Sequence, residues 1–269
     1  IMAVIGSGRA FPQITITNSQ TWTPPMSGNV CIHVVGAGGG ACASTNYATG
    51  GGAGGYCKYN SLAVTPANNL TIVVGAGGRG GIGSANTGYP GLAGGNSTVS
   101  GTGLSSTLTA NGGAGGPTGF SNGTGSGGTA SGGNVNNQGG SCPSYQISQG
   151  GSVGIYGTGE DGSTGHGQAN DYTVPDSAGG GLAMSQFGVI VGGTKVGNMR
   201  LTAGSGKEGF GFVGLDGGDL MGGGSNRTSD WHGAGGNGGI GGGGGGSNSY
   251  SGYGGRGGDG IVLIQYLPW

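Results

Sequence analysis

Charged residues are scarce in this chain of 269 residues, where Asp, Glu, Lys and Arg together make up 6% and the formal net charge is −1. Proteins that neutralise the phosphates of DNA or RNA carry basic stripes. Long apolar runs are also lacking, and no window approaches the length of a membrane span. We therefore expect neither a nucleic-acid partner nor insertion into a membrane.

Helix-forming patterns and proline are in short supply as well. No stretch carries apolar residues at helical spacing between capping residues, so α-helix should be almost absent. Nine prolines and frequent Gly-Gly pairs exclude the repeat of collagen. The opening IMAVIGSGRAF has an apolar run too short for a signal peptide. We expect either export without a cleavable signal, as on a virion released by lysis, or a signal already removed.

Cysteine is limited to four residues: Cys31, Cys42, Cys57 and Cys142. Their spacing matches no zinc template. A disulfide, or a metal site that includes His33, is the alternative to buried thiols, and we favour the thiols because cysteine behaves as a small apolar residue. His33 itself is interpreted as one residue of an alternating strand.

Acidic residues are few and scattered. Glu160 and Asp161 with His166, or Asp230 with His232, could form acid–base or metal pairs. Polar residues in glycine loops are more commonly solvated turn residues. We therefore expect a protein that is not an enzyme.

Phosphate-loop patterns also lack their context. The run GSGKE at 204–208 has Glu where a phosphate loop needs Ser or Thr, and no strand–helix unit surrounds it. We expect no cofactor and no bound metal.

Glycine is what the chain has in abundance, with 79 residues. The pattern G-x-G-G-x-G-G-x-G occurs at 75–83, 233–241 and 252–260, and its side chains stand three residues apart, which is the period of a polyproline-II helix. Such a helix has no internal hydrogen bonds, so its backbone groups need neighbouring chains. The sequence predicts a bundle of packed polyglycine-II helices instead of a flexible linker.

Strand patterns lie near both ends of the chain. Apolar residues alternate or run together within 11–35, at 70–74 and at 261–266. We predict an irregular, all-β-like fold with a small β-structure near the two termini, so that both chain ends lie at one pole. Residues 1–35 would form a β-rich N-terminal attachment segment. Residues 36–269 would form the polyglycine-II domain, closed by the C-terminal strand 261–266.

Aromatic residues stand between the glycine runs in stretches otherwise rich in Gly, Ser and Asn, a composition typical of antibody binding loops. Rigid frameworks commonly present binding residues on loops. The alternative is that these rings cover the ends of the bundle. Side chains within the nine-residue patterns, such as Arg79, Arg256 and Asp259, are expected to face solvent or neighbouring segments and not a binding partner. The candidate binding residues are Tyr145, Tyr156, Tyr172, Phe187, Phe210, Phe212, Trp231 and Tyr250.

Four motifs carry a resemblance to a known family. They are WTPP from Trp22, VCIHVVGAGGG from Val30, IVVGAGG from Ile72 and GGDGIVLIQY from Gly257. From Phe11 onward the chain resembles the glycine-rich domain of bacteriophage tail fibres, and it is similar to the tip adhesins of T-even-type phages. The resemblance implies packed polyglycine-II helices whose distal loops contact an outer-membrane protein or a surface glycan of a bacterium.

The function expected from this resemblance is that of a tail-fibre adhesin, made in the host cytoplasm and carried on the virion as an extracellular tip. Its partners would be the bacterial receptor and other virion proteins, including identical copies. The alternative is a virion decoration or extracellular filament subunit that assembles through its glycine-rich body. Ice or carbohydrate-surface binding would need a flat regular face, and a depolymerase would need paired carboxylates.

Overall fold

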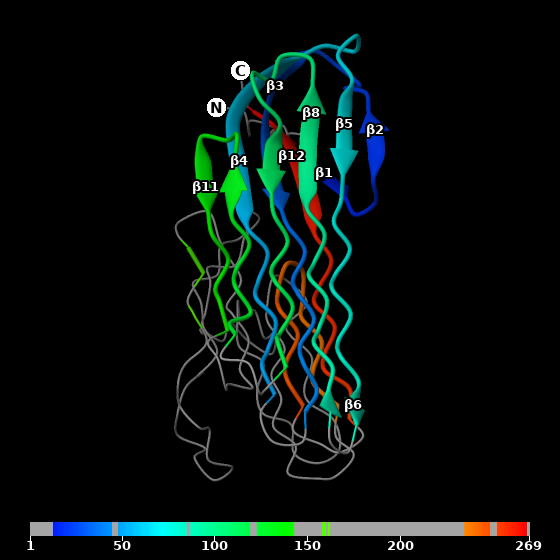
Figure 1. The fold of residues 1–269 in the computed structure, drawn as a ribbon. Helices are drawn as coiled ribbons and strands as arrows, with labels where there is room; N and C mark the ends of the chain where they lie inside the picture. The colour runs from blue at the N-terminus through cyan, green and yellow to red at the C-terminus, as the bar shows by residue number, and fades with distance from the viewer. Residues whose placement is uncertain are drawn as a thin grey trace, which may run out of the picture.

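The computed structural model describes residues 13–44, 48–84, 87–118, 123–142, 158–159, 161, 234–247 and 252–267. Within these ranges the chain forms twelve β-strands and no helix, in agreement with the expectation from the sequence. Consequently, the described part of the chain contains no helix that is long and apolar enough to cross a membrane. Most strands gather at one end of an elongated molecule, and glycine-rich segments run side by side away from them (Figure 1).

The first sheet has five antiparallel strands and contains the strands nearest to both chain ends. β12 pairs with β1 on one side and with β3 on the other, so this strand lies inside the sheet, and β3 is the central strand. In spatial order the strands are β1 (Gln13–Ile16), β12 (Ile261–Tyr266), β3 (Gly28–Val35), β4 (Tyr56–Val64) and β11 (Val135–Asn137).

The second sheet also has five antiparallel strands. In spatial order they are β10 (Ala130–Ser131), β9 (Leu108–Ala110), β8 (Ser97–Gly101), β5 (Leu70–Val73) and β2 (Gln20–Trp22). β2 is an edge strand and is followed by Pro24 and Pro25, which suits an edge because proline cannot donate to a sheet ladder. A two-stranded hairpin of β6 (Gly83–Ser84) and β7 (Thr87–Gly88) lies at the far end of the molecule (Figure 1).

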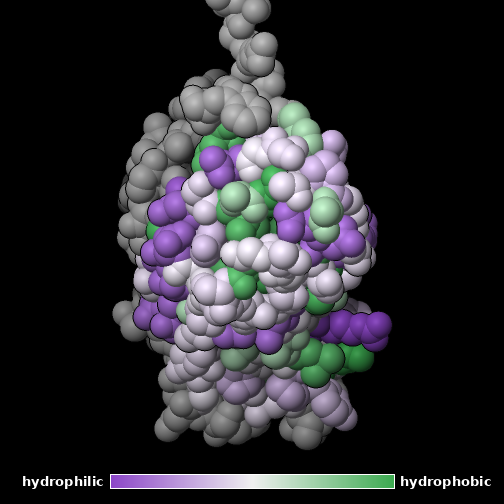
Figure 2. Space-filling view, turned by 90° about the horizontal axis from the view of Figure 1, so that it is seen from above, coloured by the Kyte–Doolittle hydropathy of each residue, from purple (hydrophilic) through white to green (hydrophobic). Residues whose placement is uncertain are grey.

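The hydrophobic core lies between these two sheets. Alternate residues of β3, namely Val30, Ile32 and Val34, are fully buried against residues of the second sheet such as Leu70 and Ile72. The β-branched residues suit this pleated, buried surface. Figure 2 looks onto the end that carries the strands, where hydrophilic residues lie around much of the periphery and smaller hydrophobic areas lie between them. The sheets therefore form a sandwich that anchors the glycine-rich segments.

Glycine-rich segments continue the strands without a break in direction (Figure 1). Residues 36–44 follow β3, 75–83 follow β5, and 252–260 lead into β12. Nearly all of these residues are outside any strand. The spacing of the strands in the two sheets thus sets where each glycine-rich segment starts.

The central segment, 36–44, exchanges hydrogen bonds with a period of three residues. Its amides at Gly36, Gly39 and Cys42 all donate to carbonyls of segment 48–55, each over 2.9 Å. The intermediate amides donate with the same period to segments 88–96 and 252–260. Every amide and carbonyl group from residue 37 to residue 42 has a partner in another segment. The backbone is therefore satisfied without helix or sheet ladders, as buried polar groups require.

Six segments surround 36–44 and form a closed ring, because each is hydrogen-bonded to the next. All residues of the central segment are buried, and none has a side chain larger than cysteine. In order around the ring, the six are 75–83, 88–96, 111–118, 48–55, 241–247 and 252–260, with the last bonded to the first. The interior of this half of the molecule is therefore made of backbone.

Glycine is required where these segments touch. A Cβ atom placed on Gly38 would overlap the carbonyl oxygen of Gly242, and one on Gly77 would overlap that of Gly257. The atoms in the way belong to backbone and not to a flexible side chain. The abundance of glycine therefore follows from the close approach of neighbouring segments.

Candidate functional site

Four neighbouring segments at the surface form what we call the ridged face: 88–96, 75–83, 252–260 and 234–240. Backbone hydrogen bonds hold them in this order, for example from Leu92 N to Arg79 O and from Gly254 N to Gly81 O, each over 2.8 Å. The fourth segment donates to the third, from Gly238 N to Arg256 O over 2.8 Å. The backbone of the face is thus fixed before any ligand arrives.

Side chains project from this face at every third residue. Along 252–260 the three side chains are exposed and the six glycines are buried. The exposed positions of the two central segments are Ala76, Arg79 and Ile82, and Tyr253, Arg256 and Asp259. The solvent-facing position expected for Arg79, Arg256 and Asp259 is confirmed.

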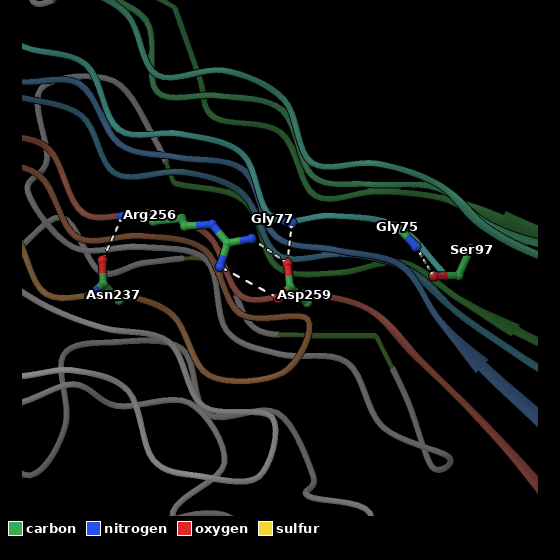
Figure 3. Close-up of polar contacts among 6 residues, drawn as sticks. All are labelled: Gly75, Gly77, Ser97, Asn237, Arg256 and Asp259. Atoms are coloured by element: carbon green, nitrogen blue, oxygen red, sulfur yellow. Dashed lines mark hydrogen bonds and ion pairs between the residues drawn. The ribbon is translucent and has the colours of Figure 1, made fainter. Parts of the chain in front are cut away.

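Asp259 ties two segments of the ridged face together (Figure 3). Its Oδ1 accepts a hydrogen bond of 2.7 Å from the amide of Gly77, and its carboxylate also pairs with the guanidinium of Arg256. The Arg256 amide donates in turn to Oδ1 of Asn237 over 2.9 Å. Because the ion pair is about half exposed, we expect it to contribute at most about 1 kcal/mol. The side chains of Asp259 and Asn237 therefore hold neighbouring segments of the ridged face together.

The far end of the face carries an apolar patch, defined by Ile82, Tyr89, Leu92 and Tyr253. Their exposed fractions are 55%, 56%, 59% and 58%. Ile82 and Tyr253 are bridge partners on adjacent segments, so their side chains start from neighbouring backbone positions. Soluble proteins seldom leave several large apolar side chains exposed together without a partner. The patch is therefore a candidate binding surface.

A second cluster of reactive groups lies on β3 and β4, on the face of the first sheet that points away from the core. Tyr56 Oη lies 2.8 Å from His33 Nδ1, and Cys31 Sγ lies 3.3 Å from His33 Nε2. His33 is buried and pairs in register with Leu263 and Lys58, so it occupies the strand position predicted for it. Because a neutral imidazole has one donor and one acceptor, this arrangement satisfies both of its nitrogens.

Burial keeps this cluster uncharged. It lowers the pKa of His33 to about 4, with the charge of Lys58 acting in the same direction, and it raises the pKa of Cys31 and of Tyr56. A nucleophilic cysteine needs the opposite shifts, a stabilised thiolate beside a protonated histidine. The cluster is therefore suited to packing and not to nucleophilic attack.

The four cysteines are all buried and none takes part in a disulfide, in agreement with the interpretation of the sequence. Burial raises the pKa of Cys57 to about 11 and that of Cys142 to about 12. In the described part of the chain, no group of three His, Cys, Asp or Glu residues is placed to hold a metal ion. Cys31, Cys57 and Cys142, whose pKa values burial raises, are thus protonated at neutral pH.

His33 should make the protein less stable in mild acid. Its pKa is about 4 in the folded state and about 6.5 when unfolded, so the unfolded chain binds the proton first as the pH falls. The contribution of His33 to the free energy of unfolding is fully present above pH 6.5. It is lost as the pH falls toward 4, by roughly 3 kcal/mol in total. Urea unfolding of the wild type and of His33→Gln at intervals from pH 7.5 to pH 4.5 measures the difference. Equal pH dependence in both proteins would contradict the assignment.

The eight aromatic residues proposed from the sequence lie outside the described residues. They are Tyr145, Tyr156, Tyr172, Phe187, Phe210, Phe212, Trp231 and Tyr250. The same holds for Glu160, His166, Asp230, His232 and the run 204–208. Asp161 is described, is exposed, and accepts a hydrogen bond of 2.7 Å from the amide of Ser141, as a turn residue would.

Sequence reasoning missed the apolar patch. The signal was present, since Ile82 and Tyr253 occupy variable positions of the nine-residue pattern that turn out to be exposed. Tyr89 and Leu92 stand three residues apart in the same manner, in a segment that lacks the full pattern. Their adjacency to the other two could not be read from the sequence because it depends on the order of the segments.

The fold and the ridged face together define a class of protein. Its glycine-rich body is capped by a β-sandwich, and its exposed side chains project from backbone segments that are hydrogen-bonded to one another. The chain belongs to the glycine-rich domain family, whose model matches residues 14–267. No curated protein matches it.

Proposed function

We propose that this protein is a receptor-binding module at the tip of a bacteriophage tail fibre, extracellular on the virion and without enzymatic activity. The proposal is supported by the membership in the glycine-rich domain family and by the resemblance of the motifs from Trp22, Val30, Ile72 and Gly257 to those of tail fibres. Its partners would be an outer-membrane protein or surface glycan of a bacterium, together with neighbouring virion proteins.

We further propose that the glycine-rich segments are polyglycine-II helices. The observation in favour is the period of three residues in the hydrogen bonds of segment 36–44, with a ring of six bonded neighbours. The matching period of exposed side chains along 252–260 is a second, independent observation. Polyglycine-II helices have no internal hydrogen bonds, so their buried amide and carbonyl groups need partners on neighbouring helices.

The observation that carries the proposed function is the difference between the two ends of the elongated molecule. The strands near both chain ends lie together at one end (Figure 1), which suits attachment to a fibre. At the other end, bridges join Ala43 to Tyr89 and to Ser247, so the ends of separate segments are held side by side. Loops that leave such a fixed frame lose less conformational freedom on binding, and several copies on a virion would add avidity.

The test is adsorption of beads coated with the full chain to a panel of bacterial strains. A second chain has residues 142–172 and 199–231 exchanged for those of a related fibre. We expect saturable binding to a subset of strains, and a different subset for the exchanged chain. The proposal fails if no strain binds the beads, or if the exchange leaves the bound strains and their affinities unchanged.

The alternative function, a virion decoration or filament subunit, predicts self-association in the absence of cells. The hydrogen bonds between glycine-rich segments give it a physical basis, since a segment of an identical copy could extend the same pattern as a strand extends a sheet edge. Sedimentation of the purified chain over a wide range of concentration distinguishes the two. Growth into long assemblies without any binding to cells would favour the alternative.

A further inference from the structure

The apolar patch of Ile82, Tyr89, Leu92 and Tyr253 is exposed and lies beside the positively charged side chain of Arg79. The Arg79 side chain is exposed, lies one turn from Ile82 on the same segment, and makes no ion pair among the described residues. Its backbone carbonyl accepts the hydrogen bond of the Leu92 amide, which places these two residues side by side. The patch thus combines aromatic and aliphatic surface with one positive charge.

We propose that this patch docks a polypeptide segment that carries apolar side chains and an acidic one, belonging to a protein on the bacterial surface. The inference rests on the proposed function and deepens it by naming the chemical class of the receptor. Tyrosine supplies a large contact area at low entropic cost, and the guanidinium of Arg79 can hold a carboxylate through two parallel hydrogen bonds.

A glycan fits the patch less well. Sugars bind through hydrogen bonds to polar side chains together with stacking on aromatic rings, and the carboxylate and amide oxygens of the ridged face are already engaged. Asp259 accepts from the Gly77 amide and pairs with Arg256, and the Asn237 oxygen accepts from the Arg256 amide. Within the patch itself, a ligand meets apolar side chains, the tyrosine hydroxyls and the neighbouring Arg79 guanidinium.

A second copy of the chain also fits less well. A twofold interface must be self-complementary, whereas this patch lies beside a cation that makes no ion pair among the described residues, and Asp259 on the same face is already paired with Arg256. Four exposed side chains are far fewer than the roughly 20–30 residues that each partner contributes to a standard interface. The patch is therefore sized for part of a receptor contact.

The experiment measures binding of the full chain to outer-membrane vesicles from a strain that the beads adsorb. Vesicles are used intact, after protease digestion and after periodate oxidation of their glycans. The patch variants are Ile82→Ser with Tyr253→Ser, and Arg79→Gln. Two controls are matched to them: Met26→Ser removes a side chain that is 40% exposed next to the strands, and Arg256→Gln removes the paired cation.

We expect protease to abolish binding and periodate to leave it unchanged. The double variant should weaken binding at least tenfold and Arg79→Gln about fivefold, with both controls within twofold of the wild type. Binding that survives protease but not periodate would assign the site to a glycan and overturn the inference. So would binding that the patch variants leave unaltered, or a dimer of the chain that these variants dissociate, while the adhesin function itself would stand. If no vesicle binds, the proposed function fails and this inference fails with it.

Discussion

Gly38→Ala is expected to lower the midpoint of thermal unfolding by about 10 °C. Gly38 lies in the central segment, and an added Cβ would overlap the carbonyl group of Gly242. The segments around it are bonded to one another, so none can move aside without breaking hydrogen bonds. Overpacking against a rigid neighbour costs about 3 kcal/mol, and each kcal/mol corresponds to roughly 2–4 °C in a chain of this length.

The matched control for this variant is Ala76→Ser, which also adds one heavy atom to a glycine-rich segment. Ala76 is exposed, so the added hydroxyl meets solvent. We expect a change of less than about 0.5 kcal/mol. Calorimetry or circular dichroism of both variants supplies the measurement. If Gly38→Ala melted within 2 °C of Ala76→Ser, the close packing of backbones in the central segment would be wrong.

Ile72→Ala should produce a second large loss of stability, about 2–5 kcal/mol. Ile72 is 1% exposed and lies in the core between the two sheets, where its truncation leaves a cavity. Among the described residues, the hydrophobic clusters lie on the strands, so the sandwich supplies most of the hydrophobic stabilisation of this part of the chain. Unfolding in urea, followed by tryptophan fluorescence because Trp22 is part of the same core, measures the effect.

Val73→Ala is the control, since Val73 is the next residue of β5 and is 42% exposed. We expect it to cost less than about 1 kcal/mol. Both variants replace a β-branched residue by alanine in the same strand, so the change in strand propensity is similar in the two. The difference between their losses of stability therefore measures the effect of burial. Similar losses for the two would show that Ile72 does not face the core.

Several elements were predictable because their signals are local. The runs at 30–35, 70–74 and 261–266 became β3, β5 and β12, since continuous β-branched residues favour buried strands. The three-residue spacing of the nine-residue pattern reappears as the alternation of exposed side chains and buried glycines along 252–260. The strands β8 and β9 were not predicted, because Ser97–Gly101 and Leu108–Ala110 carry too few apolar residues to form a pattern.

The course of β4 shows what a sequence pattern misses. Tyr56, Tyr59, Leu62 and Val64 are its large apolar residues, and they do not follow a single alternation because the register with β3 shifts between the pairs Ile32–Tyr59 and Val30–Leu62. The bulge adds a residue, so the core-facing positions change from odd to even numbers along the strand. Tyr56 therefore lies with Val35 and Leu263 outside the main core, while Leu62 and Val64 lie within it.

The sequence by itself determined the period of the glycine-rich segments, the near absence of helix and the pairing of a glycine-rich body with strands near both ends. These properties depend on residues close together in the chain, whose steric preferences act locally. Only the tertiary structure decided which segments are neighbours, and hence that Ile82, Tyr89, Leu92 and Tyr253 meet in one patch beside Arg79. Glycine presents the same surface in every segment, so the segments that adjoin strands, such as 36–44, 75–83 and 252–260, take their places from the strand pairing in the two sheets and not from the glycines themselves.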